Sequence, residues 1–296
     1  MAKTPLRVIV TRPAREAQEW AQRLQSEGFA AETLSLMGIE PLPAWKLSSQ
    51  NSLPTDYAAL FFVSSNAVAH FFKPKVAPGQ QTPARAAIKS IANCDRLLAL
   101  PTLRWMAPGP GTLAALRAAG VPADQIDAPP LDAAQFDSQT LWQQISQRPW
   151  RGAKVLVVCG ESPAATGDNA APATTGRGWL TQQWLSAGAE VDTLVVYRRL
   201  APLLDAAQLQ RARQAAKDGS VWLFSSAEAI ACLEQQPGLA DVDWQRARAL
   251  ATHPRIAAAA RALRWGVVAM TRPSLADVSR TLRSIESTGA FDHADP

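Results

Sequence analysis

Short apolar runs alternate with longer amphipathic stretches along most of the chain. In the longer stretches apolar residues recur at helical spacing, which predicts helices of roughly ten to fifteen residues. The short runs are rich in Val, Ile and Leu and predict strands that, alternating with helices, favour parallel sheets covered on both faces. An α/β fold is therefore expected. The predicted strands are Leu6–Thr11, Ala30–Leu34, Ala58–Val63, Leu103–Ala107, Lys154–Cys159, Val191–Val195, Val221–Phe224, Ala247–Ala251 and Val267–Thr271.

The chain also repeats an ordered set of motifs, which predicts two similar lobes. Gly28 and Gly188 each follow a helix of the repeated segment and are expected to cap its carboxyl end. The repeated pairs are SEGFAAETL (26–34) with SAGAEVDTL (186–194), FFVSSNAV (61–68) with WLFSSAEAI (222–230), proline-initiated helices at 107–121 and 251–267, and closing helices at 136–145 and 273–285.

Length and composition narrow the class of protein. The 296 residues favour two domains, at roughly 150 residues each. With 47% of residues apolar and 19% charged, a soluble globular protein with a substantial core is expected. No apolar run approaches the roughly 20 residues of a membrane-spanning helix, and the N-terminus lacks a signal peptide's apolar core. We therefore expect a cytoplasmic protein without membrane contact.

The cysteines, the histidines and the net charge argue against a disulfide-rich protein, a metal protein and a nucleic-acid-binding protein. Cys94, Cys159 and Cys232 lie far apart, which disfavours a disulfide framework and predicts reduced thiols. The three histidines lack metal-type spacing, so no metal site is expected. The 30 basic and 25 acidic residues give a net charge of +5 without a basic run, which disfavours nucleic acid. A mild positive excess suits an anionic small molecule, provided that arginines converge on its site.

The carboxyl ends of the predicted strands are the expected place for a ligand, as in other parallel α/β sheets. The turns at these ends are Thr11-Arg12, Ser64-Ser65, Pro108–Thr112, Cys159–Glu161, Ser225-Ser226 and His253-Pro254. None of them carries a nucleophile beside a base, a carboxylate pair or a metal cluster.

The motifs VIVTRP, FVSSNAV, PGPGT, SAGAEVDTLVVYRR and LFSSAEAI, in this order, resemble the uroporphyrinogen-III synthase family over nearly the whole chain. The resemblance implies two similar parallel-sheet α/β lobes, joined by two adjacent linkers, with a cleft between them. Residues 1–37 with 200–296 would form one discontinuous lobe and residues 42–194 the inserted lobe. Residues 38–41 and 195–199 would be the hinge linkers.

The same resemblance implies an enzyme that cyclises the linear tetrapyrrole hydroxymethylbilane to uroporphyrinogen III with inversion of ring D. No cofactor or metal is expected. Loss of the ring A hydroxyl gives an azafulvene cation, which ring D attacks through its substituted carbon to form a spiro intermediate. The implied partner is this anionic substrate, and transient contact with hydroxymethylbilane synthase stays open. A monomer is expected.

Residue roles follow from the resemblance too. Tyr197, in the VVYRR segment, would assist departure of the hydroxyl; packing at a domain junction is its alternative role. Substrate carboxylates would meet backbone N–H groups and hydroxyls at helix N-termini, although capping alone also explains each Ser and Thr. The implied binding residues are Arg12, Ser64, Ser65, Asn66, Gly109, Thr112, Gly160, Ser225 and Ser226.

Some positions depart from the family pattern. His253 and Ile256 stand where a glycine and a threonine are usual in the family. Cys159 stands where an arginine is often found, so we expect less guanidinium, from fewer arginine side chains, on that side of the site. Residues 73–95 and 161–178 are expected to be long loops, the second either a lid or a tolerated insertion. These departures keep open an alternative, a non-catalytic two-lobed binding or regulatory module.

Overall fold

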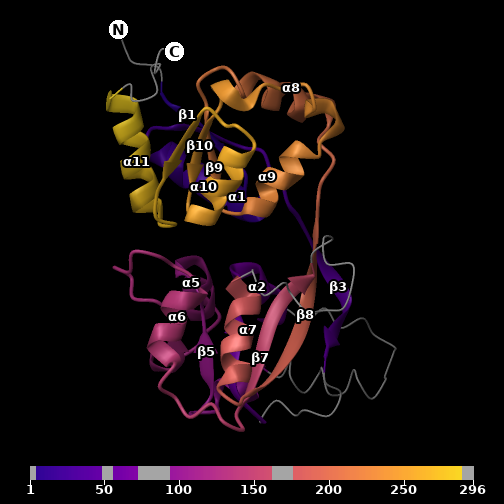
Figure 1. Ribbon diagram of the computed structural model, residues 1–296, viewed down its shortest axis with the longest axis vertical. Coiled ribbons are helices and arrows are strands. Elements are labelled where there is room, and N and C mark those ends of the chain that lie inside the picture. Colours follow the sequence, from indigo (N-terminus) through magenta and orange to yellow (C-terminus); the bar gives the residue numbers. More distant parts are fainter. Residues whose placement is uncertain (1–4, 49–55, 73–93, 162–175, 289–296) are drawn as a thin grey trace. The chain divides into compact units, whose positions relative to one another are not determined.

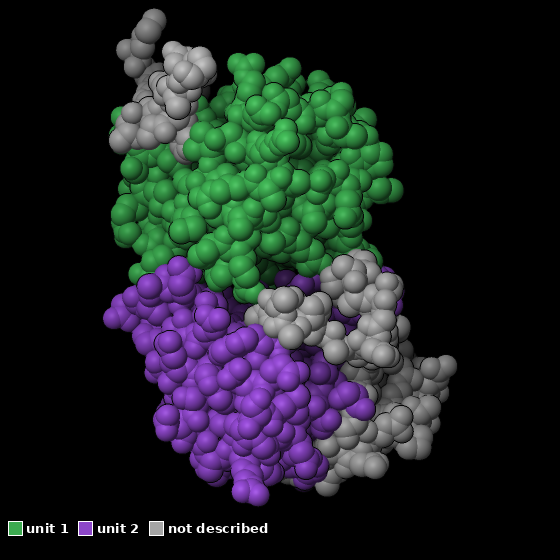
Figure 2. Space-filling view, viewed as in Figure 1, with its two compact units in different colours: residues 1–38, 200–296 green, residues 39–199 purple. Residues whose placement is uncertain are grey.

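Two compact units make up the chain in the computed structural model, which describes residues 5–48, 56–72, 94–161 and 176–288. One unit contains residues 1–38 and 200–296, and the other contains residues 39–199 (Figure 2). Each unit has its own sheet, with helices packed on both faces (Figure 1).

The first unit is a five-stranded sheet in which all neighbouring strands are parallel, in the order β11-β10-β9-β1-β2. Apolar faces of α1 and α11 cover one side of this sheet, and those of α8, α9 and α10 cover the other. The strands are β1 (Arg7–Val10), β2 (Ala30–Thr33), β9 (Val221–Phe224), β10 (Arg248–Ala251) and β11 (Val267–Met270). The helices are α1 (Ala14–Ser26), α8 (Ala206–Ala215), α9 (Ala227–Glu234), α10 (Pro254–Ala262) and α11 (Leu275–Thr288).

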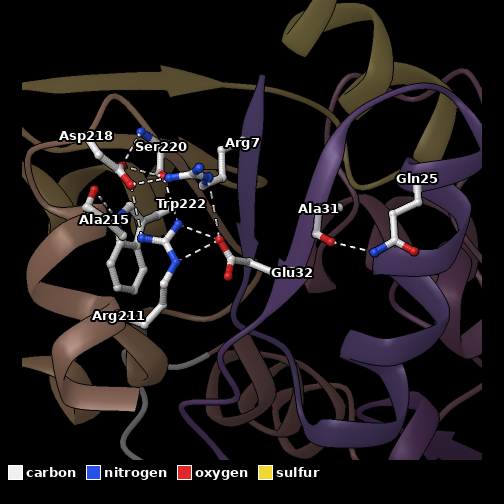
Figure 3. Close-up of polar contacts among 9 residues, drawn as sticks. All are labelled: Arg7, Gln25, Ala31, Glu32, Arg211, Ala215, Asp218, Ser220 and Trp222. Atoms are coloured by element: carbon white, nitrogen blue, oxygen red, sulfur yellow. Dashed lines mark hydrogen bonds and ion pairs between the residues drawn. The ribbon is translucent and has the colours of Figure 1, made fainter. Parts of the chain in front are cut away.

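A network of charged side chains joins the two separated segments of this unit (Figure 3). Arg211 on α8 donates from Nε to Glu32 on β2 at 2.8 Å and from Nη1 to Asp218 at 3.1 Å. Arg7, at the start of β1, donates to the same Asp218 carboxylate at 2.6 Å. Asp218 in turn accepts hydrogen bonds from the backbone and hydroxyl of Ser220. The network thus fastens β1 and β2 to the segment that leads into β9.

The second unit has a six-stranded sheet in the order β3-β8-β7-β4-β5-β6. Its five strands from β8 to β6 are parallel neighbours.

Helices cover both faces of this sheet, α2, α4 and α5 on one face and α6 and α7 on the other. The strands are β3 (Gly38–Leu47), β4 (Tyr57–Phe62), β5 (Arg104–Met106), β6 (Ile126–Asp127), β7 (Lys154–Glu161) and β8 (Glu190–Leu200). The helices are α2 (Ser65–Phe72), α4 (Cys94–Leu98), α5 (Pro110–Ala118), α6 (Ser138–Ile145) and α7 (Gly176–Ser186). Short 3-10 turns occupy Ala123–Gln125, Pro237–Leu239 and Trp244–Arg246.

The edge strand β3 runs in the direction opposite to that of its neighbour β8. A Cβ placed on Gly38 would lie 3.2 Å from the Cβ of Leu200, so the start of β3 lies at the end of β8. Just beyond the other end of β3, the backbone N–H of Ser48 donates to the carbonyl oxygen of Thr193 at 3.0 Å. The two strands are therefore antiparallel.

All nine predicted strands are present, with ends that differ by a few residues, and two strands were not predicted. The missed strands are β3, which contains two prolines, and the two-residue β6. The predicted strand at Val191–Val195 continues to Leu200, and its hydrogen-bonded neighbour in the sheet is β3. The expected linkers 38–41 and 195–199 therefore lie within strands. Of the expected loops 73–95 and 161–178, residues 73–93 and 162–175 lie outside the described residues.

The two predicted helix caps are confirmed. Gly28 has φ +94° and Gly188 has φ +84°, the left-handed region that glycine adopts without strain. In each case the next residue donates its N–H back into the last helical turn, Phe29 to Leu24 and Ala189 to Trp184, both by 3.0 to 3.1 Å bonds. The repeat in the sequence is thus a repeat of one helix-to-strand turn.

Asp218 is expected to link stability to pH. Burial by itself would raise the pKa of Asp218, but the hydrogen bonds from Ser220 and Arg7 lower it below the usual range. A carboxylate with a lowered folded-state pKa stabilises the protein above its unfolded pKa of about 3.9, and this stability is lost as pH falls through the folded pKa. Asp218→Asn should cost about 1–2 kcal/mol at pH 7, and the difference from the parent should shrink towards pH 3.

Urea unfolding at a series of pH values measures this difference. The matched control is Asp241→Asn, because Asp241 also binds an arginine, Arg213, but its side chain is 70% exposed. The pKa of Asp241 is also lowered, by its hydrogen bond with Arg213, but solvent screens this exposed pair, so Asp241→Asn should depart much less from the parent than Asp218→Asn does. An Asp218→Asn deficit of equal size at pH 3 and pH 7 would contradict the linkage.

Candidate functional site at the switch point of the second sheet

The direction of chain winding reverses beside β4. From β4 the chain adds β5 and β6 on one side, and it then adds β7 and β8 on the other. Adjacent strands whose connections leave in opposite directions mark the place where parallel α/β sheets bind ligands, beyond the strands' carboxyl ends. In this unit the place is defined by Ser64 after β4 and by Gly160 at the end of β7.

Tyr197 of β8 connects these two strand ends. Its hydroxyl lies 3.1 Å from the Oγ atom of Ser64. Its ring lies so close to Gly160 that a Cβ there would be 2.3 Å from two ring carbons. Any larger residue at 160 would overlap the ring, so glycine at this position is a packing requirement. The side chain of Tyr197 is 1% exposed and is held on every side.

A bulge in β8 directs the tyrosine to this position. Cys159 of β7 pairs with Val195, but the next residue, Gly160, pairs with Tyr197, so Val196 is an extra residue in β8. Without it, Val195 and Tyr197 would point to the same face. Instead Val195 packs towards α6 and α7, while Tyr197 packs with the α2 face. Bulges commonly redirect side chains in this way beside functional sites.

The hydroxyls of Ser64 and Tyr197 carry two hydrogens between them, and the bond within the pair uses one of these. Ser64 Oγ accepts the backbone N–H of Ala67 at 3.1 Å, and the Tyr197 hydroxyl accepts Nη2 of Arg199 at 3.4 Å. One of the two hydroxyl hydrogens is used within the pair. Because each hydroxyl carries a single hydrogen, the second hydrogen has no acceptor among the described residues, whichever of the two hydroxyls donates within the pair.

His70 of α2 packs on the Tyr197 ring. The ring centroids are 5.5 Å apart and the planes are inclined by 27°. The phenol thus has the imidazole as well as Gly160 and Ser64 as neighbours. Sequence reasoning did not single out His70 or Arg199, because only the fold brings them to the tyrosine.

The remaining predicted residues of this unit lie at neighbouring helix starts. Ser65 and Asn66 are the first residues of α2. Gly109 is the extended residue before α5, and Thr112 lies in the first turn of that helix, which packs against α2. Since Thr112 is only 6% exposed, its side chain belongs to the packed side of α5. The structure therefore groups Ser64, Gly160 and Tyr197 and places the other four beside β4 and β5.

In the first unit, the corresponding reversal lies between β1 and β9, where Arg12 and the Ser225-Ser226 pair are found. Arg12 donates to Glu16 at 3.3 Å, and its guanidinium carbon lies 4.3 Å from the centroid of the Trp20 ring. Burial lowers the pKa of Arg12, against the opposing effect of Glu16. Among the described residues its buried Nε atom has no hydrogen-bond partner. Ser226 caps α9 by accepting the backbone N–H of Glu228 at 3.1 Å.

Two departures from the family pattern have structural explanations. His253 precedes α10, and its Nδ1 atom accepts the backbone N–H of Arg255 at 3.1 Å, so the imidazole acts as the helix cap. Ile256 is 6% exposed and belongs to the core of the first unit. Both side chains contribute to the fold.

The expectation of less guanidinium near Cys159 than in other family members stays a prediction. Burial raises the pKa of the Cys159 thiol, against the opposing effects of Arg177, in the first turn of α7, and of Arg199. Sequence reasoning missed Arg177 because it lies next to the breaker-rich stretch, 18 positions away from Cys159 in sequence.

Within the described ranges, no three His, Cys, Asp or Glu side chains are grouped so that they could hold a metal ion. Among the helices of the same ranges, none is both long enough and apolar enough to span a bilayer.

Comparison with known proteins places these features in context. The family model described as uroporphyrinogen-III synthase HemD matches residues 18–278. A mutant uroporphyrinogen III synthase from the extremely thermophilic bacterium Thermus thermophilus is similar in structure, with a TM-score of 0.54, 17% identity, and coverage of 97% of this chain and 100% of that chain. Uroporphyrinogen-III synthetase from Helicobacter pylori has a TM-score of 0.52 and 14% identity, covering 95% of this chain and 100% of that one. The two likenesses confirm the predicted α/β class with parallel sheets. No curated protein sequence matches the chain.

The close approach at Gly160 leads to a test of the site's packing. Gly160→Ala should lower the free energy of unfolding by roughly 1–3 kcal/mol, because the new methyl group forces the Tyr197 ring to move. A crystal structure of the variant should show the Ser64 and Tyr197 hydroxyls beyond hydrogen-bond distance. Gly111→Ala is the control, since a Cβ built there would meet no atom of the other described residues within 4 Å, apart from its chain neighbours and its own helix. An unmoved tyrosine in Gly160→Ala would contradict the packing argument.

Proposed function

The chain belongs to the uroporphyrinogen-III synthase family, and on this premise we propose that Tyr197 and Ser64 carry the family's reaction. That reaction is the cyclisation of hydroxymethylbilane to uroporphyrinogen III in tetrapyrrole biosynthesis. The observation that supports the assignment is the hydroxyl pair at the carboxyl ends of β4 and β8, 3.1 Å apart, with one hydrogen to offer.

The reaction requires little from the protein's functional groups. The ring A hydroxymethyl group loses its hydroxyl, which leaves as water once it has received a proton, and the product is an azafulvene cation. Ring D attacks this cation through its substituted carbon, the spiro intermediate fragments, and ring D closes again in the inverted orientation. A final proton loss restores the aromatic pyrrole. The protein must position the two ends of the chain and provide a hydrogen-bond donor to the departing oxygen.

Tyr197 is suited to that donor role. The backbone N–H of Ala67 and the guanidinium of Arg199 both donate into the hydroxyl pair. In the arrangement where Ser64 donates to the phenol, the hydrogen offered to the leaving hydroxyl is that of Tyr197. The bulge at Val196 and the missing side chain at Gly160 hold the phenol in place for this step.

Substrate carboxylates require donors elsewhere. We assign backbone N–H groups at the starts of α2 and α5 to this role, with Ser65, Asn66, Gly109 and Thr112 as the local residues, because partial positive charge collects at helix N-termini. In the first unit the same role falls to Arg12, Ser225 and Ser226. Arg12 already binds Glu16, so a substrate carboxylate there would compete with a protein carboxylate.

The alternative, a non-catalytic binding module, has no need of a hydroxyl donor aligned at a strand end. The departures that motivated it at His253 and Ile256 are accounted for by capping and core packing. A monomeric state, a cytoplasmic location, independence from cofactors and transient contact with hydroxymethylbilane synthase all stay predictions.

Replacing Tyr197 with Phe should slow formation of the type III isomer by roughly tenfold to a thousandfold, because one donor to a substrate that also ionises unaided is lost. Type III should remain the enzymatic product over a growing type I background, since the whole site controls geometry. The measurement is incubation with freshly generated hydroxymethylbilane followed by chromatographic separation of the isomers.

The chain provides a matched control, because Tyr57 is its one other tyrosine. Its hydroxyl donates to Asp192 at 2.9 Å, within the sheet and away from Ser64. Tyr57→Phe removes the same atom and should retain the parent rate. Parental turnover by Tyr197→Phe would make Tyr197 a packing residue. Type I product alone from the unmodified protein, at the spontaneous rate, would favour the binding module.

A further inference from the structure

One helix contacts the Tyr197 phenol at two places. Ser64, the residue before α2, has its Oγ atom 3.1 Å from the phenol oxygen. His70, in the last turn of the same helix, stacks on the ring, with the centroids 5.5 Å apart and the planes inclined by 27°. The contact with Ser64 fixes where the oxygen lies. The contact with His70 fixes a second property, the plane of the ring.

The plane of the ring decides where the hydroxyl hydrogen points. A lone pair of a phenol oxygen conjugates with the ring, so the O–H bond lies close to the ring plane. A ring that pivots about its oxygen therefore keeps the 3.1 Å contact with Ser64 but swings its hydrogen away from a given acceptor. Because a hydrogen bond weakens steeply as its angle closes, the strength of Tyr197 as a donor depends on the tilt of its ring.

The last turn of α2 is a firm base for the stacking contact. Phe71, next to His70, packs edge-on against Phe62 of β4 at 5.2 Å between centroids, and Phe72 stacks on Trp105 of β5 at 5.7 Å. These aromatic contacts hold the end of the helix on β4 and β5. The imidazole is half-buried, so its flat face packs on the phenol without full burial of its polar nitrogens. Side chains on rigid elements of this kind are the most precise positioning groups.

We propose that His70 is a positioning residue of the reaction: its imidazole sets the plane of the Tyr197 ring and so directs the hydroxyl hydrogen to the leaving group. His70 acts through the phenol and transfers no proton itself. The proposal rests on the proposed function of Tyr197, and it adds a residue that sequence reasoning did not single out.

The test compares His70→Leu with His70→Phe. Both substitutions replace the imidazole with an apolar side chain, but only phenylalanine keeps a flat ring that can stack on the phenol. Phe72→Leu is the control, because it removes an aromatic ring from the same helical turn, one that stacks on Phe62 and Trp105. Thermal melting checks that each variant is folded.

A spectroscopic readout follows the phenol without substrate. The chain has two tyrosines, so in a Tyr57→Phe background Tyr197 is the only one. Tyrosine labelled with ¹³C at Cζ then gives a single NMR signal, from the carbon that bears the phenol oxygen. This signal should stay close to its parental position and width in His70→Phe. In His70→Leu it should shift and broaden, because a tilted hydroxyl makes different hydrogen bonds.

His70→Leu should lower kcat for the type III isomer by roughly threefold to thirtyfold, with KM within about twofold of the parent. The reason is that the direction of a donor affects the transition state more than substrate binding. His70→Phe should recover most of this loss. Phe72→Leu should lower the melting temperature and keep kcat within about twofold of the parent.

Parental kcat or an unchanged NMR signal in His70→Leu, together with the expected loss in Tyr197→Phe, would overturn the positioning role and leave the proposed function standing. An equal loss of kcat in His70→Phe and His70→Leu would also overturn it, because the imidazole nitrogens would then matter and the flat ring would not. So would an equal loss in Phe72→Leu, which would indicate a general loosening of α2. Parental turnover by Tyr197→Phe would remove the proposed function and this proposal together.

Discussion

The winding of each sheet from its interior is the constraint on which the rest of the structure depends. Two parallel strands of one sheet must be joined by a crossover, and nearly all such crossovers are right-handed. When the next strand is added on one side of the sheet, the helix of the crossover therefore lies on one face. When the next strand is added on the opposite side, the helix lies on the other face. Where the winding reverses, the helices that follow two adjacent strands lie on opposite faces of the sheet. These strands are β4 and β7 in one unit and β1 and β9 in the other. The discontinuous first unit is the clearest result of this winding, because its interior strand β1 comes from the start of the chain, and β9, its neighbour across the reversal, begins at residue 221.

At the reversal in the second unit, backbone geometry decides which side chain reaches the strand ends. A regular β8 would send Tyr197 towards α6 and α7, into an apolar core of tryptophans. The extra residue Val196 turns it towards Ser64, and the missing side chain at Gly160 makes room for its ring. Neither feature is chemically reactive. Both set the position of a phenol, which is the property that a positioning enzyme has to control.

The sequence indicated most of the fold and part of the site, and the division has a physical basis. Strands such as β9 and caps such as Gly28 depend on neighbouring residues, so local patterns reveal them. Strand order, the direction of β3 and the bulge at Val196 depend on partners far away in the chain, which no local pattern records. Strand ends and a family motif mark Tyr197 and Ser64 as candidates in the sequence, whereas the contact of His70 with Tyr197 requires the packing of α2 to be known.

The two switch points also differ in what their arginines contact. In the first unit, Arg12 donates to Glu16 and lies over the ring of Trp20. In the second unit, Nη2 of Arg199 donates to the Tyr197 hydroxyl, so a cation lies beside the hydroxyl pair. Because the phenol oxygen accepts this hydrogen bond, its own hydrogen is the group that it can donate. The arginine of the second switch point thus favours the donor role that we propose for Tyr197, whereas the arginine of the first is held by a carboxylate of the chain.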